Sequence, residues 1–153
     1  MNQTPTLEDA ISLAALSHKG QIDKAGAPYI LHPLRVMMSL GRETTETERI
    51  AAILHDVVED CEVSFDDLRA MGFSEEVVAA VDALTKRDDE KEDYMRAIRR
   101  VAQHPVARRV KIGDLTDNLD ESRIANPTEK DKMRLEKYRA AREFLLELED
   151  RKL

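Results

Sequence analysis

The chain has 153 residues, enough to bury a proper core, and we expect one domain over residues 1–153. A net charge of −7 argues against broad nucleic-acid binding, which needs an extended basic surface, but not against a small anionic ligand held by a local cluster. A single cysteine excludes an internal disulfide, and without a membrane-length apolar run or a signal-peptide core the sequence indicates a cytoplasmic protein.

Helix signals follow one another along the whole chain. Many Ala, Glu, Arg and Leu residues with few Gly and Pro favour helices. The expected helices run from Thr6 to residues 17–20, from residues 32–33 to Leu40, from Thr45 or Thr47 through residues 50–60, from Ser64 to Gly72, from Ser74 to about Leu84, from Tyr94 to before His104, from Pro105 to about Asp120, and from Thr128 through Leu148. Residues 85–93 are polar enough for a loop or a frayed helix start. Because no strand or hairpin pattern is present, we expect an all-α fold of about seven to nine helices.

The stretch Ile50–Asp60, set on one helix, has an apolar face and an opposite acidic face. His55 and Glu59 are four residues apart, as are Asp56 and Asp60, so the two pairs run side by side. Three carboxylates crowded beside an imidazole repel one another unless a cation lies among them. A bound metal ion is the simplest candidate, and a solvated acidic helix face is the alternative.

Ligand-type residues elsewhere in the chain extend this hypothesis. Four of them could meet one metal ion: His32, His55, Asp56 and Asp114. Two imidazoles and two carboxylates suit Mn²⁺, Fe²⁺ or Zn²⁺ rather than a soft thiolate site. Lys111, Asp114 and Asn118 are spaced by three and four, share a helix face, and can hold a phosphate beside a metal. A surface Lys–Asp ion pair is the alternative for that helix.

Four motif blocks follow one another in the sequence. They are H-x-G-Q…K-x-G-x-P-Y-x-x-H-P-L-x-V at residues 18–36, A-x-I-L-H-D-x-V-E-D at 51–60, V-x-A-L-T-K at 81–86 and V-K-x-x-D-x-x-x-N at 110–118. This order resembles the HD-domain hydrolases of the Rel/Spo family, and the chain length resembles the stand-alone small alarmone hydrolases. The resemblance implies a single compact HD-domain helical bundle that removes the 3′-pyrophosphate from guanosine tetra- and pentaphosphate, with Mn²⁺ as the metal.

The resemblance also implies roles for particular residues. The metal ligands would be His32, His55, Asp56 and Asp114. The acidic pair that orients or deprotonates the attacking water would be Glu59 and Asp60. The substrate contacts would be Lys24, Tyr29, Lys111 and Asn118. His18 matches a motif histidine that the family does not use as a ligand, and we expect it to tie the first helix to the following loop.

Two positions depart from the family pattern. Asp23 stands where an arginine packs on the guanine base in family members. The identity of the base is therefore undecided, and an adenosine alarmone is an alternative substrate. Leu115 stands where a lysine or arginine commonly follows the metal aspartate, and Asp117 adds negative charge nearby. We therefore expect a pocket that favours a less highly charged substrate.

The leading hypothesis is hydrolysis of the 3′-pyrophosphate of a purine nucleotide alarmone, (p)ppGpp or (p)ppApp, by a metal-activated water. The partner would be a small anionic nucleotide and neither a nucleic acid nor a membrane, and a homo-oligomer is compatible with the sequence. Two alternatives stay open. One is another HD-type phosphohydrolase, such as a nucleotidase or phosphodiesterase, although a two-metal site lacks the extra histidines. The other is a catalytically silent nucleotide-binding module.

Overall fold

The computed structural model describes residues 3–151, which contain helices and loops but no strand. The helices are α1 (Leu7–Ser17), α2 (Leu31–Ser39), α3 (Glu46–Leu54), α4 (Val57–Asp60), α5 (Phe65–Ala70), α6 (Glu75–Leu84), α7 (Tyr94–Ala102), α8 (Pro105–Asn118) and α9 (Glu129–Asp150), with short 3₁₀ helices η1 (Asp88–Glu90) and η2 (Glu121–Arg123). The predicted all-α bundle is confirmed. Within the described residues, no helix has both the length and the apolar character that crossing a membrane requires. The extent of the domain over residues 1–153 stays a prediction.

Side-chain caps begin several helices at the residues that the sequence indicated. Thr6, Ser64 and Thr128 each form a reciprocal capping box with the aspartate three positions later. Thr45 caps α3, accepting a hydrogen bond from the backbone N–H three residues on at 3.1 Å, so the helix begins before Thr47. These local bonds satisfy backbone N–H groups that a helix start leaves without partners, which is why capping residues locate helix starts well.

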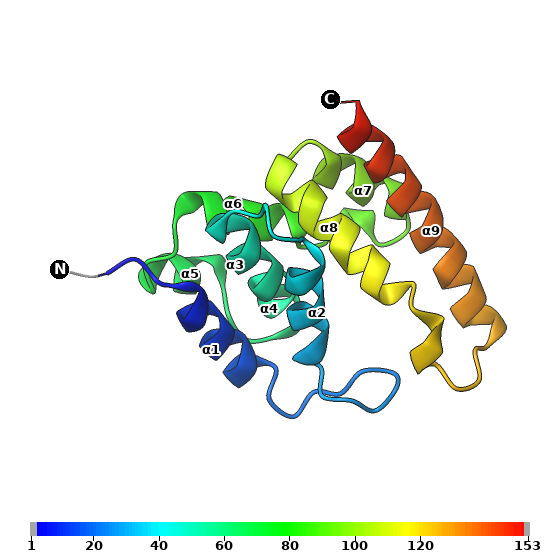
Figure 1. Cartoon of the computed structure of the whole chain (residues 1–153), viewed down its shortest axis with the longest axis horizontal. Coiled ribbons are helices and arrows are strands. Elements are labelled where there is room, and N and C mark those ends of the chain that lie inside the picture. The colour runs from blue at the N-terminus through cyan, green and yellow to red at the C-terminus, as the bar shows by residue number, and fades with distance from the viewer. Residues whose placement is uncertain (1–2, 152–153) are drawn as a thin grey trace.

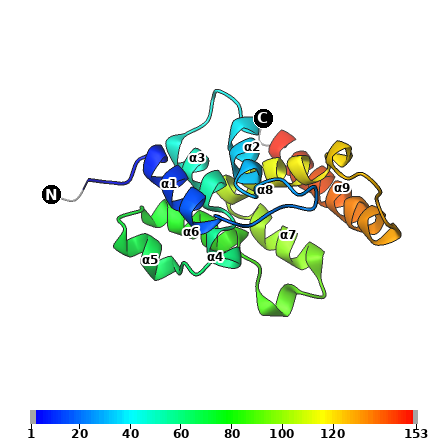
Figure 2. The ribbon, with the colours of Figure 1, turned by 90° about the horizontal axis from the view of Figure 1, so that it is seen from below.

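Helices α3 and α8 lie at the centre of the fold (Figure 1). Helix α3 packs against α1, α2, α6 and α8, and α8 also packs against α2, α6, α7 and α9. Figures 1 and 2 both show α1 and α9 toward opposite ends of the molecule's longest axis. Buried apolar side chains form one core among α1, α3, α5 and α6 and another among α7, α8 and α9.

Small residues lie where α2, α3, α6 and α8 meet. A fully buried cluster there consists of Val36, Ala51, Ala52, Ala80 and Val110. Gly113 of α8 is so close to α2 that a Cβ atom added to it would lie 2.8 Å from Ser39 Oγ and 3.3 Å from Val36 Cγ1. This close approach sets Asp114, the next residue of α8, against the helix that carries His32.

Gly113→Ala is expected to lower the free energy of unfolding by about 1–2 kcal/mol. The overpacking cost of about 1–3 kcal/mol exceeds the gain of about 0.5–1 kcal/mol that alanine gives inside a helix. Urea unfolding followed by circular dichroism measures the change. Adding Ser39→Ala removes the oxygen that the new methyl group meets and should recover part of the loss. A Gly113→Ala variant as stable as the parent would contradict the close packing of α2 and α8.

The stretch Ile50–Asp60 is not one continuous helix, so this prediction was wrong. Helix α3 ends at Leu54 and α4 begins at Val57, with His55 and Asp56 in a turn between them. The His55 imidazole donates from Nδ1 to the Ala52 carbonyl at 2.6 Å, and Asp56 has φ −105° and ψ −2°, away from helical values. Neighbouring residues on a helix do not face each other, whereas this break lets His55 and Asp56 meet. The predicted apolar face is buried as expected.

The polar segment 85–93, expected as a loop or frayed helix start, contains the 3₁₀ helix η1. Its Glu90 is only 2% exposed and accepts hydrogen bonds from Arg100 of α7 at 2.7 and 2.9 Å. These bonds from Arg100 outweigh the effect of desolvation and lower the pKa of the Glu90 carboxyl to about 2. Arg100 also donates to the Ala83 carbonyl of α6. The segment is therefore held against α6 and α7 through one buried carboxylate.

Candidate metal centre and adjoining cavities

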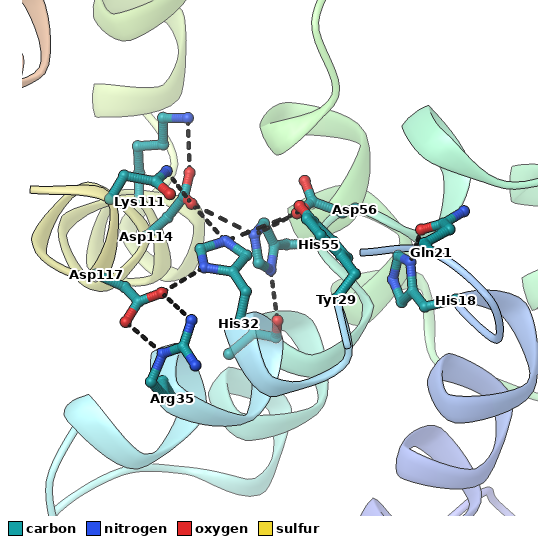
Figure 3. Close-up of polar contacts among 12 residues, drawn as sticks. His18, Gln21, Tyr29, His32, Arg35, His55, Asp56, Lys111, Asp114 and Asp117 are labelled. Carbon is teal, nitrogen blue, oxygen red and sulfur yellow. Dashed lines mark hydrogen bonds and ion pairs between the residues drawn. The ribbon is translucent and has the colours of Figure 1, made fainter. Parts of the chain in front are cut away.

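Four side chains from separate parts of the chain converge near one point (Figure 3). His32 comes from α2, His55 and Asp56 from the turn after α3, and Asp114 from α8. Metal-ligating atoms of His32, His55 and Asp56 all lie within 4.8 Å of one another. Asp114 Oδ1 lies 2.9 Å from His32 Nε2 and 3.6 Å from His55 Nε2, and Asp56 Oδ2 lies 3.0 Å from His55 Nε2. The structure thus brings together all four residues that the sequence suggested as ligands.

The two imidazoles are oriented by bonds at their Nδ1 atoms. His55 Nδ1 lies 2.6 Å from the Ala52 carbonyl, which can only accept, so Nδ1 carries the hydrogen and Nε2 keeps a lone pair. His32 Nδ1 lies 2.6 Å from Asp117 Oδ2. Among the described residues, the buried Nε2 of His55 has no hydrogen-bond partner. An orphaned imidazole nitrogen facing carboxylate oxygens fits a bound divalent cation.

The carboxylates at the centre are held by three residues that the sequence had suggested as substrate contacts. The Tyr29 hydroxyl donates to Asp56 Oδ2 at 2.5 Å. Lys111 Nζ donates to Asp114 Oδ2 at 2.9 Å, and Asn118 Nδ2 donates to Asp114 Oδ1 at 3.0 Å. Each of the three therefore orients a candidate ligand.

The electrostatics of the centre favour a bound positive charge. Burial raises the pKa of Asp114, but the Lys111 ammonium and the hydrogen bond with His32 outweigh it and hold that pKa well below its usual range. Burial likewise lowers the pKa of His55, yet the negative charges of Asp56 and Asp114 raise it overall. The carboxylates therefore stay ionised, and their negative charge favours a proton on the His55 imidazole. A bound metal cation would be stabilised by the same negative charge.

The acidic pair Glu59 and Asp60 lies beside this centre. Both line a cavity of about 220 Å³ together with Asp56, Lys111 and Asp114. Glu59 Oε1 accepts the backbone N–H of Lys86 at 3.0 Å, which fixes its position. Partial burial, and then the negative charges of Asp56 and Glu59, raise the pKa of Asp60 to about 6. A carboxylate with a pKa near neutrality is a better proton acceptor than an ordinary one.

A second, larger cavity of about 440 Å³ adjoins the first. Both cavities are lined by Tyr29, His32, Asn118 and Tyr138. The larger one is also lined by charged side chains, chiefly Asp23, Lys24, Arg35, Arg123 and Arg134. Cations therefore line both cavities, and the acidic pair Glu59 and Asp60 lines only the smaller one.

Comparison with known proteins decides the family. The HD domain family model matches residues 10–138. The chain belongs to the HD domain family. It is 32% identical over 127 residues to a Vibrio cholerae guanosine-3′,5′-bis(diphosphate) 3′-pyrophosphohydrolase, covering 76% of this chain and 18% of that protein. It is 31% identical over 128 residues to the bifunctional (p)ppGpp synthase/hydrolase SpoT of Escherichia coli K12, covering 77% and 18%.

A solved structure agrees with this assignment. It belongs to a metazoan orthologue of SpoT described as hydrolysing ppGpp, with a TM-score of 0.77 and 28% identity over 97% of this chain and 87% of that one. The predicted membership of the Rel/Spo group of HD hydrolases is confirmed. The chain spans less than a fifth of the length of the two long bacterial relatives. The stand-alone character stays a prediction.

The two departures from the family pattern have structural explanations in this HD domain. Asp23 Oδ1 accepts hydrogen bonds from the backbone N–H groups of Ala25 and Ala27, both at 2.9 Å, and so holds the loop before α2. Leu115 is fully buried in the core among α7, α8 and α9 and is absent from the residues lining either cavity. The Leu115 side chain therefore points away from the site. The Asp23 carboxylate stabilises the loop in which it lies.

Lys24 and His18 do not contact the four candidate metal ligands in the way that Tyr29, Lys111 and Asn118 do. Lys24 is exposed, with Nζ 3.5 Å from Asp131 Oδ1 of α9, at the rim of the larger cavity. His18 contacts Gln21 Oε1 through Nδ1 at 2.8 Å and packs against Tyr29, with ring centroids 5.0 Å apart and ring planes tilted by 50°. This packing agrees with the expected structural role of His18.

Sequence reasoning missed the part that Asp117 plays in this HD domain. It was noted only as added negative charge, yet it contacts His32 and is paired with Arg35 at 2.7 Å and Arg123 at 3.4 Å. The two arginines compensate the charge that was expected to repel substrate. A signal was available, because Arg35 follows His32 by three residues and Asp117 follows Asp114 by three, so on facing helices the two pairs lie side by side.

Proposed function

We propose that this HD domain hydrolyses the 3′-pyrophosphate of a purine nucleotide alarmone, (p)ppGpp or (p)ppApp. The observation that carries the proposal is the convergence of His32, His55, Asp56 and Asp114 beside the acidic pair Glu59 and Asp60. Relatives named as (p)ppGpp 3′-pyrophosphohydrolases support the same reaction. The two adjoining cavities offer separate room for the nucleoside and the diphosphate ends of such a substrate.

The proposed cofactor is a divalent metal ion, and Mn²⁺ is the ion we propose. His32, His55, Asp56 and Asp114 would hold it, because imidazole nitrogens combined with carboxylate oxygens suit a borderline to hard ion. When bound, the ion supplies a Lewis acid that makes a water more acidic and offsets negative charge on a phosphoryl oxygen. The orphaned Nε2 atom of His55 and the lowered pKa of Asp114 support this assignment.

In the proposed reaction the chain's own carboxylates move the proton. The oxygen of a water forms a bond to the phosphorus attached to ribose O3′, and the bond between that phosphorus and O3′ breaks. Asp60, with Glu59 beside it, takes the proton that the water loses, and the departing O3′ takes up one proton from Asp60 or from solvent. The products are pyrophosphate and a nucleotide with a free 3′-hydroxyl group.

The proposed substrate contacts are Lys24, Tyr29, Lys111 and Asn118. Lys111 and Asn118 already hold Asp114, so a phosphate approaching the centre would meet their remaining N–H groups. Lys24 is at the rim of the larger cavity, where its exposed ammonium can reach an outer phosphate. The base remains guanine or adenine, and the proposed partner is a cytoplasmic nucleotide, with neither a nucleic acid nor a membrane involved.

Incubation with ppGpp, ppApp and 3′-phosphorylated nucleotides, with and without Mn²⁺, tests the proposed function. We expect Mn²⁺-dependent release of pyrophosphate from a 3′-diphosphate substrate, measured by anion-exchange chromatography. Release of single phosphate groups would instead support another HD-type phosphohydrolase, such as a nucleotidase. Tight nucleotide binding without turnover would support the silent binding module. The comparison of ppGpp with ppApp decides the base.

A further inference from the structure

Asp117 contacts one of the proposed metal ligands without being a ligand itself. It lies on α8 one turn after Asp114 (Figure 3), and its side chain is 10% exposed. Its Oδ2 atom is 2.6 Å from His32 Nδ1, on the opposite side of the imidazole from Nε2, which faces Asp114 and the centre. Asp117 therefore touches the ring at the one other atom that can form a hydrogen bond.

Two arginines hold the Asp117 carboxylate in place. Arg35 of α2 donates from Nε to Oδ1 at 2.7 Å and from a terminal nitrogen to Oδ2 at 3.1 Å, a bidentate arrangement. Arg123 of η2 donates to the Asp117 backbone carbonyl at 2.6 Å and approaches Oδ2 at 3.4 Å. Both arginines line the larger cavity. The carboxylate thus has a fixed orientation and a compensated charge.

A carboxylate at Nδ1 has a definite consequence for the imidazole. It accepts a hydrogen from Nδ1, so Nε2 becomes the atom that offers a lone pair, and the ring cannot turn over without losing the bond. His55 obtains the same orientation from a backbone carbonyl, which no substitution of a side chain removes. His32 depends for it on the side chain of Asp117.

We propose that Asp117 is a positioning residue for the metal centre, and that Arg35 and Arg123 lock it against His32. The inference rests on the proposed metal-dependent function. Asp117 sets the tautomer and the direction of His32, and its loss weakens metal binding although it contributes no ligand atom. Outer partners of this kind are worth about 10–100-fold in metal affinity.

The test compares Mn²⁺ affinity among variants of the full chain, measured by competition with a fluorescent chelator. Asp117→Ala should weaken Mn²⁺ binding by about 10–100-fold. Asp117→Asn keeps an oxygen that can accept from Nδ1 but loses the charge, so it should lie between the parent and the alanine variant. Asp120→Asn is the matched control, because Asp120 is also beside Arg123, at 3.9 Å, and Asn removes the same charge. Its affinity should stay within about twofold of the parent.

Nuclear magnetic resonance supplies a reading that does not involve the metal. Long-range ¹H–¹⁵N spectra of the metal-free protein should show His32 with hydrogen on Nδ1 in the parent and in Asp120→Asn. In Asp117→Ala the Nδ1 signal should move or exchange with solvent. Assignment of this signal by comparison with His32→Gln, and thermal unfolding of each variant, complete the experiment.

Different outcomes overturn different statements. If the parent binds no Mn²⁺, the proposed metal-dependent function fails. If the parent binds Mn²⁺ and a folded Asp117→Ala binds it within threefold, the positioning role is rejected. An equal loss in Asp120→Asn also rejects that role, since general charge would then explain the effect. If the alanine variant does not fold, Asp117→Asn decides, and parent-like affinity together with a parent-like His32 spectrum counts against the proposal.

Discussion

Asp56→Asn is expected to release the metal ion and abolish hydrolysis. Asp56 Oδ2 lies 3.0 Å from His55 Nε2 and 3.8 Å from His32 Nε2, so its charge lies at the middle of the proposed ligand set. The amide keeps the shape of the side chain but removes that charge, and its nitrogen can face the site as a donor. The loss of affinity should exceed the roughly 10–100-fold that an outer partner contributes. Elemental analysis of the purified variant measures the metal directly.

Asp66→Asn is a matched control for this substitution. Asp66 has a 91% exposed side chain on α5 and pairs only with Arg69 among the contacts of the described residues. The same loss of one carboxylate charge there should leave both metal content and hydrolysis unchanged. An Asp56→Asn protein that retains one equivalent of metal and full turnover would remove Asp56 from the ligand set.

Several helix starts and the convergence of the four candidate ligands could be predicted because each depends on a local or recurrent signal. Thr6 and Thr128 mark helix starts by bonds to a residue three positions away, and such bonds do not depend on the rest of the fold. The motif order suggested His32 and Asp114 as partners although 82 residues separate them. Their juxtaposition is a tertiary feature that periodicity alone does not reveal.

The break between α3 and α4 could not be predicted from the same signals. No glycine or proline interrupts the stretch, and every residue from Ile50 to Asp60 is compatible with a helix. The break coincides with a bond from the His55 side chain to the Ala52 carbonyl and with the non-helical backbone of Asp56. A side chain that competes for a backbone acceptor leaves little trace in sequence patterns.

The two faces of α8 show why the sequence did not reveal the direction in which Leu115 points. Consecutive helix residues point about 100° apart, so a residue beside Asp114 need not face the metal. Leu115 packs with Ile98 and Leu145 in the core among α7, α8 and α9, a role that helical spacing from Ile112 could have indicated. Similarity to a motif identified position 115 as unusual, whereas the direction of its side chain follows only from the packing of α8.

Replacing Glu59 and Asp60 together by their amides is expected to lower turnover by about 10²–10⁴-fold, the usual range for loss of a general base. Mn²⁺ and nucleotide should remain bound, because neither residue belongs to the proposed ligand set. In Glu59→Gln the amide carbonyl oxygen can still accept the Lys86 N–H, so the local fold is preserved. Single-turnover hydrolysis and equilibrium nucleotide binding separate the two effects.

Glu62→Gln provides the comparison for the double variant, since Glu62 is exposed two residues beyond the pair and is not among the residues lining either cavity near the centre. It should turn over at the parent rate. The raised pKa of Asp60, about 6, makes it a better proton acceptor than an ordinary carboxylate, so Asp60→Asn alone should also lower turnover strongly. If the double variant hydrolyses substrate at the parent rate, the proton must leave by another route, and Glu59 and Asp60 serve only to attract the cation.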